Sequence, residues 1–242
     1  MTMAKAGDNI ETQNANWRFS GETVKNFDQH VEKSVPLYNE GHTLICDISD
    51  FFLSDNSIVY EIGCSTGALI SKIAKHNSSK KVDYFAVDIE KDMITAAKKM
   101  ATVEKINNVE FIHDDFNELN VDDESVNFVV CYYTMQFISP ALRQKTFDKI
   151  YRMLKWGGGL VIFEKTRAPD ARFQDIMSLL YTEYKLKKGY TSDEIISKSR
   201  SLKGVLEPFS LDGNIGLMNR AGFKDICSIQ KYICFEGFLA IK

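Results

Sequence analysis

The sequence predicts an α/β fold whose core is a doubly wound, mostly parallel sheet of seven strands. Short apolar segments alternate with longer segments whose apolar residues recur at helical spacing, which is typical of parallel strands joined by crossover helices. A turn with two glycines follows one apolar strand, and the next strand ends in an acidic residue. With 242 residues, 44% of them hydrophobic, the chain can bury one sizeable core.

The elements follow from this alternation in chain order. Strands are expected near Ile58 and over residues 82–87, 109–112, 126–131 and 159–163, and helices from Gly67, over residues 93–105 and over residues 141–154. Two further strands, residues 226–234 and 237–241, are separated only by Phe235 and Glu236. That spacing predicts a short hairpin and an antiparallel pair at one edge of the sheet.

One domain over residues 17–242 is expected, after a flexible polar tail at residues 1–16. Residues 17–50 are a candidate helical lid. A helical insertion at residues 166–214 has apolar residues at roughly helical spacing and is too long for a simple crossover. Because ligands in α/β sheets lie outside the carboxyl ends of the strands, the insertion would roof a pocket or supply a dimer interface.

Charge and composition argue against several classes of protein. The net charge of −3 gives no basic footprint for nucleic acid, and the lysines between residues 185 and 203 fit a solvated helix face. No stretch approaches the roughly 18 continuous apolar residues that a transmembrane helix needs. The polar start also lacks the apolar centre of a signal peptide. We expect a cytoplasmic protein with neither a nucleic-acid nor a membrane partner.

Cysteines and histidines give no case for a metal site. The five cysteines show no C-x-x-C spacing and lie mostly in apolar segments, which favours buried thiols. The four histidines, His30, His42, His76 and His113, are scattered, and surface or helix-face positions are expected for them. We predict no metal.

The segment from Ile58 to Asp88 predicts a nucleotide-bearing cofactor. Gly63 and Gly67 would let a ligand approach the backbone, although close packing of helix against strand also favours glycine. Asp88, about 20 residues beyond the turn, can accept hydrogen bonds from ribose hydroxyls. Glu61 stands where a pyrophosphate would prefer no acid, which favours a cationic or zwitterionic ligand.

The turn E-I-G-C-S-T-G, residues 61–67, resembles the first motif of class I methyltransferases that depend on S-adenosylmethionine (SAM). Asp88 is similar to their ribose-binding acid, and H-D-D-F at residues 113–116 resembles the loop that contacts the adenine ring. The resemblance implies SAM as the cofactor and a Rossmann-like fold.

Three segments resemble a narrower family, the carboxy-SAM synthases of the tRNA wobble-uridine pathway. They are S-V-P-L-Y at 34–38, Y-T-M-Q-F-I at 133–138 with R-Q at 143–144 and D-K-I-Y at 148–151, and E-K at 164–165 with G-Y at 189–190 and E-I at 194–195. The resemblance covers the chain from about Trp17 and implies a homodimer. The candidate cofactor-binding residues are Tyr38, Glu61, Gly63, Cys64, Ser65, Gly67, Asp88, Ile89, Asp115, Phe116 and Tyr132.

The chain departs from this family at two positions. Tyr132 replaces the family's asparagine, and Ser199 falls where the family has the arginine that pairs with the carboxylate on the modified sulfonium. Arg200 is adjacent, but one step along a helix turns by about 100°, so it would serve only with a local shift. The ring of Tyr132 suits the sulfonium of ordinary SAM, with strand-end packing as the alternative.

The candidate catalytic residues are Tyr132, Tyr133, Glu164, Arg167 and Arg200. A hydroxyl or ammonium nucleophile needs a base, and Glu164, Asp170 and the tyrosines are the plausible suppliers. A structural ion pair is the alternative for Glu164. Arg167, just beyond the fifth strand, is expected to anchor a substrate carboxylate or phosphate, with a surface arginine as the alternative.

Methyl transfer from SAM to a small-molecule acceptor, in a branch close to the carboxy-SAM synthases, is the leading hypothesis. The second is carboxy-SAM formation, in which a carboxylate from prephenate ends on the sulfonium methyl. Intramolecular alkylation of the cofactor is a third, since a fold alone does not set chemistry. A SAM-binding protein without catalysis is the fourth.

Overall fold

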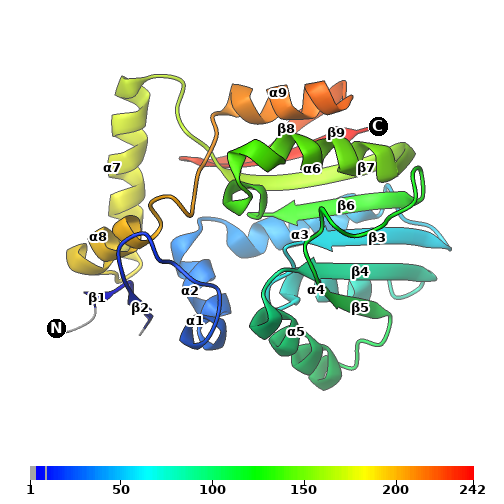
Figure 1. The fold of residues 1–242 in the computed structure, drawn as a ribbon, viewed down its shortest axis with the longest axis horizontal. Helices are drawn as coiled ribbons and strands as arrows, with labels where there is room; N and C mark the ends of the chain where they lie inside the picture. Colours follow the sequence, from blue (N-terminus) through cyan, green and yellow to red (C-terminus); the bar gives the residue numbers. More distant parts are fainter. Residues whose placement is uncertain (1–3, 9) are drawn as a thin grey trace.

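A seven-stranded mixed sheet forms the centre of the computed structural model, which describes residues 4–8 and 10–242. In pairing order its strands are β5 (Val109–His113), β4 (Val82–Asp88), β3 (Ser57–Ile62), β6 (Val126–Tyr132), β7 (Leu154–Lys165), β9 (Phe235–Ile241) and β8 (Asp225–Tyr232). The pairs from β5 to β7 are parallel, and β9 is antiparallel to both of its neighbours. The predicted doubly wound, mostly parallel sheet is confirmed (Figure 1).

Helices cover both faces of the sheet. Apolar side chains of α3 (Tyr38–Ser49), α4 (Ala68–His76) and α5 (Lys91–Glu104) pack with one face, and those of α6 (Pro140–Met153) and α9 (Leu211–Ala221) pack with the other. Strands β3, β6 and β7 are almost fully buried, since their apolar residues fill both sets of alternating positions. These segments therefore appear in the sequence as continuous apolar runs.

The C-terminal hairpin turns two residues earlier than predicted. Its turn residues are Ile233, with a positive φ of 52°, and Cys234. Phe235 and Glu236, the predicted turn, belong to β9, where they pair with Lys165 and Glu164 of β7. Both are buried. The prediction was wrong because β9 begins where its pairing with β7 begins, at Phe235. The spacing between β8 and β9 alone contains no information about β7.

Two groups of helices lie beyond the end of the sheet toward which the arrow of β6 points (Figure 1). The N-terminal group is α1 (Glu22–Lys25) and α2 (Phe27–Ser34), and the insertion after β7 forms α7 (Ala171–Lys187) and α8 (Ser192–Ser201). The hydroxyl of Tyr181 on α7 donates to the carbonyl of Ser34 on α2 at 2.8 Å, which joins the groups. This end of the sheet carries the carboxyl ends of the parallel strands, where α/β folds bind ligands.

The segment expected to be a flexible tail contains two short strands in its described part. β1 (Ala4–Lys5) pairs with β2 (Glu11–Thr12) in antiparallel fashion. Ala6 and Ile10 are buried against Trp17, and the backbone N–H of Trp17 donates to the carbonyl of Ser201, the last residue of α8, at 3.1 Å. Burial of these apolar side chains ties the segment to α8. Residues 1–3 and 9 of the expected tail lie outside the described residues.

Helix α7 stands beyond the end of the sheet (Figure 1). It exposes an apolar face. Phe173, Ile176, Leu179 and Leu180 are each 45–66% exposed. Residues three and four apart share one side of a helix, so these side chains form a continuous apolar strip. None of the described helices is long and apolar enough to cross a membrane.

The turn after β5 is fastened to α6 by two side chains. The buried ammonium of Lys149 donates to the carbonyls of Phe116 and Leu119, and the Thr146 hydroxyl donates to the side-chain oxygen of Asn117 at 2.9 Å. A buried carbonyl that loses its donor is costly. These contacts therefore hold the turn in place beside the ends of β4 and β5.

Replacing Lys149 by Met should destabilise the fold, because it leaves two buried carbonyls without their donor. We expect a loss of about 1–3 kcal/mol in the free energy of unfolding, measured by urea denaturation. Lys145→Met is the matched control on α6: its side chain is exposed and reaches Glu118 only at 3.6 Å. The control should stay within about 0.5 kcal/mol of the unmodified protein. Equal losses in the two variants would contradict this role of Lys149.

Candidate active site

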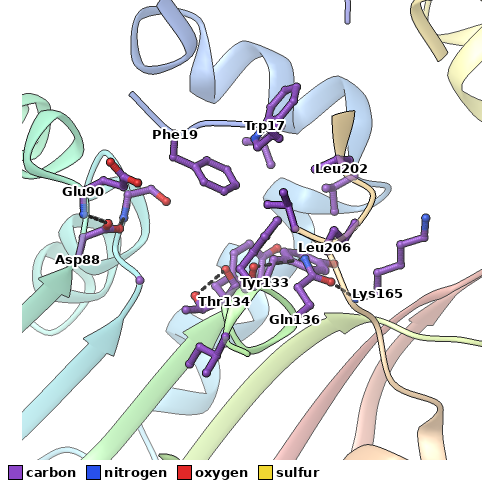
Figure 2. Close-up of a pocket in the computed structure, with 18 of the residues that line it drawn as sticks. Trp17, Phe19, Asp88, Glu90, Tyr133, Thr134, Gln136, Lys165, Leu202 and Leu206 are labelled. Atoms are coloured by element: carbon purple, nitrogen blue, oxygen red, sulfur yellow. Dashed lines mark hydrogen bonds between the residues drawn. The ribbon is translucent and has the colours of Figure 1, made fainter. Parts of the chain in front are cut away.

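A cavity of about 740 Å³ lies at the carboxyl ends of the parallel strands. Figure 2 shows Asp88 and Glu90 on one side of it, Lys165 on the other, and Trp17 and Phe19 of the N-terminal segment above. Most candidate residues from the sequence line it: Tyr38, Glu61, Gly63, Cys64, Ser65, Asp88, Ile89, Asp115, Phe116, Tyr132, Tyr133 and Arg167. Gly67, Glu164 and Arg200 do not line it.

Asp88 fixes the loop between β3 and α4. One carboxylate oxygen accepts from the Ser65 N–H at 2.8 Å, and the other accepts from the Glu90 N–H at 2.9 Å. Burial nevertheless raises the pKa of Asp88, against the lowering effect of these bonds. Each oxygen has a second lone pair. Asp88 can therefore hold the loop and still accept from two ribose hydroxyls.

Glu61 mainly stabilises the start of the helix that follows the loop. Its buried carboxylate accepts from the Ile70 N–H at 2.9 Å, in the first turn of α4. Burial raises its pKa well above the ordinary range of a glutamate. Its side chain thus satisfies a free N–H of the helix end, in a place where it also borders the cavity.

The two glycines of the turn have different roles. Gly63 borders the cavity with a φ of 74°, and a Cβ there would lie 2.4 Å from the Thr134 side chain. A Cβ on Gly67, at a φ of 77°, would lie 2.8 Å from the ring of Phe111. Close packing of helix against sheet therefore explains Gly67, in place of the predicted contact with a ligand.

The turn after β5 forms the far end of the cavity. Asp115 accepts from the Asn117 N–H at 2.8 Å, which closes the turn and leaves the carboxylate at the cavity border. The side chain of Phe116 is buried, whereas that of Ile89 is 64% exposed and also borders the cavity. An apolar side chain left open beside a cavity suits a flat ring.

Tyr38, Tyr132 and Tyr133 form an aromatic wall in the middle of the cavity. The Tyr132 hydroxyl donates to the Tyr38 carbonyl at 2.6 Å, and their ring centroids are 5.1 Å apart. A Cβ on Gly41 of α3 would lie 2.3 Å from that hydroxyl, so Tyr132 fills the space over a glycine. Tyr133 has a φ of 59°, and its buried hydroxyl has no hydrogen-bond partner among the described residues.

Glu164, a predicted base, lies behind the wall. Phe163 packs into the core on the side of α3, so Glu164, the next residue of β7, points to the opposite face. Burial raises the pKa of Glu164 to about 8, and the charge of Arg143 on α6 partly offsets this. Asp170, the other acidic candidate, caps α7 by accepting from the Phe173 N–H at 3.2 Å.

The two arginine candidates differ in their access to the cavity. Arg200 is exposed and borders a separate hollow with Asn14 and Ala15, because one step along α8 turns it away from Ser199, which borders both. Arg167 is exposed at the cavity rim, and its Nε donates to the Pro208 carbonyl at 3.3 Å. The structure does not bring Arg200 to the cavity.

Among the described residues, four lysines border the cavity: the exposed Lys203, and a cluster of Lys165, Lys185 and Lys198 whose charges act on one another. Figure 2 shows Lys165 of this cluster on the side opposite Asp88. The predicted solvated helix face was wrong for Lys185, which is buried, and for Lys198, which is partly buried. His30 is also buried, in contact with Lys198, rather than at the surface. The signal in the sequence was that Lys185 shares a helix stripe with Tyr181, four residues earlier.

Glu207 is a further residue that the sequence argument missed. It borders the cavity, and its N–H donates to the Gln136 carbonyl at 3.0 Å. The Gln136 side chain in turn accepts from the Lys165 N–H at 2.9 Å and donates to the Tyr133 carbonyl at 3.3 Å. No sequence pattern marks Glu207, because it lies in an irregular segment between α8 and α9.

No group of three or more His, Cys, Asp or Glu side chains suited to a metal occurs in the described part of the chain.

Comparison with known proteins identifies the family of this chain. Residues 59–158 match a family model described as a methyltransferase domain. A carboxy-S-adenosyl-L-methionine synthase of Staphylococcus epidermidis is 36% identical over 230 residues, which cover 93% of this chain and 97% of that protein. The chain belongs to the carboxy-S-adenosyl-L-methionine synthase family. A synthase of Nautilia profundicola is 34% identical over 226 residues, 93% of this chain and 94% of that protein.

Solved structures agree with the fold of this carboxy-SAM synthase family member. A SAM-dependent methyltransferase from Aquifex aeolicus superposes with a TM-score of 0.60 at 16% identity, over 93% of this chain and 99% of that one. A phosphoethanolamine N-methyltransferase of Haemonchus contortus, in complex with SAM, gives 0.59 at 17% identity, over 84% and 52%. The protein is a SAM-dependent enzyme with a class I methyltransferase fold.

Replacing Asp88 by Asn should weaken SAM binding at least about tenfold, because hydrogen bonds to a charged group are worth about 1.5–3 kcal/mol each. The amide also places an NH₂ group against one of the two N–H donors. Isothermal titration with SAM measures the effect. Asp83→Asn, at an exposed position of the same strand, is the matched control. Unchanged affinity in Asp88→Asn would remove Asp88 from the cofactor site.

Proposed function

We propose that this enzyme makes carboxy-SAM from SAM and prephenate. The observation that carries the proposal is the positive charge of the cavity on the side away from Asp88, where Lys165, Lys185 and Lys198 lie. The charge of three ammonium groups complements a co-substrate with two carboxylates. It does not complement a neutral alcohol, and it would repel a cationic amine. The relatives that carry the name of a carboxy-SAM synthase support the same activity.

The proposed position of SAM uses the other side of the cavity. The ribose hydroxyls donate to Asp88, and the adenine ring lies between Ile89 and Phe116, beside Asp115. The sulfonium then faces the aromatic wall of Tyr38, Tyr132 and Tyr133, whose ring faces attract a cation. Prephenate occupies the remaining space, between the sulfonium methyl and the lysines.

The conversion balances without a further reactant. A carbon–carbon bond forms between the sulfonium methyl and the ring carboxylate carbon of prephenate, and the bond from that carbon to the ring breaks. The ring becomes aromatic as its hydroxyl group leaves, and this hydroxyl and one methyl proton depart together as water. Phenylpyruvate remains. The net reaction consumes no base, so the enzyme's task is to align the two substrates, neutralise the carboxylates and exclude bulk water.

Methyl transfer to a small acceptor is the second candidate, and Glu207 favours it. This carboxylate borders the cavity and could take the proton of a hydroxyl or ammonium nucleophile. Glu164, the base that the sequence suggested, is on the far face of the sheet. The lysines near Glu207 suit an anionic substrate better than a neutral alcohol or a cationic amine. We therefore rank methyl transfer second.

The decisive assay incubates the purified protein with SAM and prephenate. We expect a product heavier than SAM by the mass of carbon dioxide, together with an equal amount of phenylpyruvate, both measured by mass spectrometry. Omission of prephenate is the control. Formation of S-adenosylhomocysteine with an alcohol or amine acceptor, and no carboxylated product with prephenate, would contradict the proposal and support methyl transfer.

A homodimer formed through the apolar strip of α7 is part of the proposal. Light scattering after gel filtration should give twice the mass of the chain. Ile176→Glu combined with Leu179→Glu should give the monomer mass, because two charges would be buried at the interface. Lys187→Glu, exposed at the end of the same helix, is the control and should stay dimeric. A monomer mass for the unmodified protein would contradict this assembly.

A further inference from the structure

We propose that Lys165, Lys185 and Lys198 form a subsite that binds a carboxylate of the co-substrate, with Lys198 positioned by His30. The inference rests on the proposed function and names the cations that would bind the co-substrate in a cavity where Ser199 supplies no charge. The three lysines come from separate elements: the end of β7, the last turn of α7 and the last turn of α8. All three border the cavity.

Two of the ammonium groups converge on one aromatic ring. The Nζ of Lys165 lies 4.6 Å from the ring centroid of Tyr181, and the Nζ of Lys185 lies 4.5 Å from the same centroid. Tyr181 itself borders the cavity, and its hydroxyl is bound to the Ser34 carbonyl. The ring therefore holds both cations at the cavity without neutralising them.

Within residues 4–8 and 10–242, none of the three lysines forms an ion pair with a carboxylate. Burial, and then the charge of Lys165, lowers the pKa of Lys185 to about 8. Burial, and then the charges of Lys185 and Lys165, lower the pKa of Lys198 to about 7. Desolvated like charges are unfavourable until an opposite charge joins them. An anion bound among them would remove this penalty.

Lys198 is held in one orientation by α2. Its Nζ donates to the Ser34 hydroxyl at 2.7 Å and to Nε2 of His30 at 2.6 Å. Because Nε2 accepts, Nδ1 carries the ring hydrogen, and it donates to Asp8 at 2.8 Å. An ammonium has three hydrogens, so one remains for a ligand. Asp8 and His30 thus position Lys198 and make the N-terminal segment part of the subsite.

The surroundings define the class of ligand as a small carboxylic acid with an apolar body. Leu202, Leu206 and Phe235 border the same part of the cavity. Figure 2 shows Leu202 and Leu206 beside the extended side chain of Lys165, on the side opposite Asp88 and Glu90. Glu207 also borders the cavity and is linked through Gln136 to Lys165. The excess of acidic groups at the Asp88 end and of lysines at the other still disfavours exchange of the two substrates between their places.

The test measures binding without turnover. S-adenosylhomocysteine has no methyl group to react, so prephenate can be titrated calorimetrically into the protein saturated with it. Lys165→Met, Lys185→Met and Lys198→Met should each weaken prephenate binding at least about tenfold, the loss of one charge-assisted hydrogen bond. Lys187→Met, exposed and two residues from Lys185, should bind prephenate as the unmodified protein does. The affinity for S-adenosylhomocysteine, measured in the same variants, reports that the fold and the cofactor site are intact.

The outcomes separate the subsite from the proposed function. Prephenate binding that depends on the lysines, without any carboxy-SAM, would overturn the function and retain the subsite. Carboxy-SAM production with unchanged prephenate binding in all three variants would overturn the subsite and retain the function. Phenylpyruvate serves as a second probe, because it keeps the side-chain carboxylate. If neither acid binds the unmodified protein, the subsite is wrong.

A pH profile tests the positioning of Lys198. Its ammonium form is present below its pKa of about 7 and is lost above it, while the carboxylates of prephenate stay ionised. Prephenate affinity should therefore fall as the pH rises from about 6 to about 8, and Lys198→Met should lose this part of the profile. The groups facing Lys198 are His30 and Ser34 of α2, Lys185 of α7, Lys165 of β7, and Asp8 and Trp17 of the N-terminal segment. A profile that is the same in Lys198→Met would overturn this role.

Discussion

The hydrogen bonds at the end of β4 are the constraint on which the geometry of the site depends. Asp88 binds the N–H of Ser65, and the carbonyl of the preceding Val87 accepts from Gly63 and Cys64 at 2.8 and 3.0 Å. Parallel neighbours end at the same edge of a sheet, so these three bonds fasten the loop after β3 to the strand beside it. The Asp88 end of the cavity is therefore shaped by the protein itself.

The other end of the cavity is assembled from segments far apart in the sequence. Thr66 of the fastened loop donates to Asp28 of α2 at 2.7 Å, so the N-terminal helices are placed relative to the Asp88 end of the cavity. Helix α2 then binds Tyr181 of α7 and Lys198 of α8. Each step uses a polar contact between two elements. The lysines occupy their places because this chain of contacts begins at a loop that is itself fixed.

The fold and the Asp88 end of the cavity could be predicted because their signals are local. The turn at residues 61–67 and Asp88 lie within one strand, helix and strand unit, and their types and spacing follow from backbone geometry. Tyr38 and Phe116 entered through resemblance and Tyr132 as a departure from it, and all three line the cavity. The hairpin turn was misplaced, because a partner strand from elsewhere in the chain decides where pairing begins. Gly67 shows the same limit, since only the position of Phe111 separates packing from ligand contact.

The lysine end could not be predicted for a related reason. A lysine on a helix has the same local pattern whether it faces water or a cavity, and only the packing of α7 and α8 against α2 decides between them. For Glu164 and Arg200 the error is the opposite one, because the sequence argument placed them at the cavity and the structure does not. Each has the residue type that the chemistry asks for, but the alternation of β7 and the rotation of α8 turn them elsewhere.

The contact between Tyr132 and Gly41 links two positions that are 91 residues apart. The tyrosine hydroxyl occupies the space that any side chain at position 41 would need, and it binds the backbone of the same helix at Tyr38. The pair therefore behaves as one unit of substitution: a larger residue on α3 requires a smaller one at the end of β6. A tyrosine at position 132 and a residue without a side chain at position 41 therefore have to occur together in this fold.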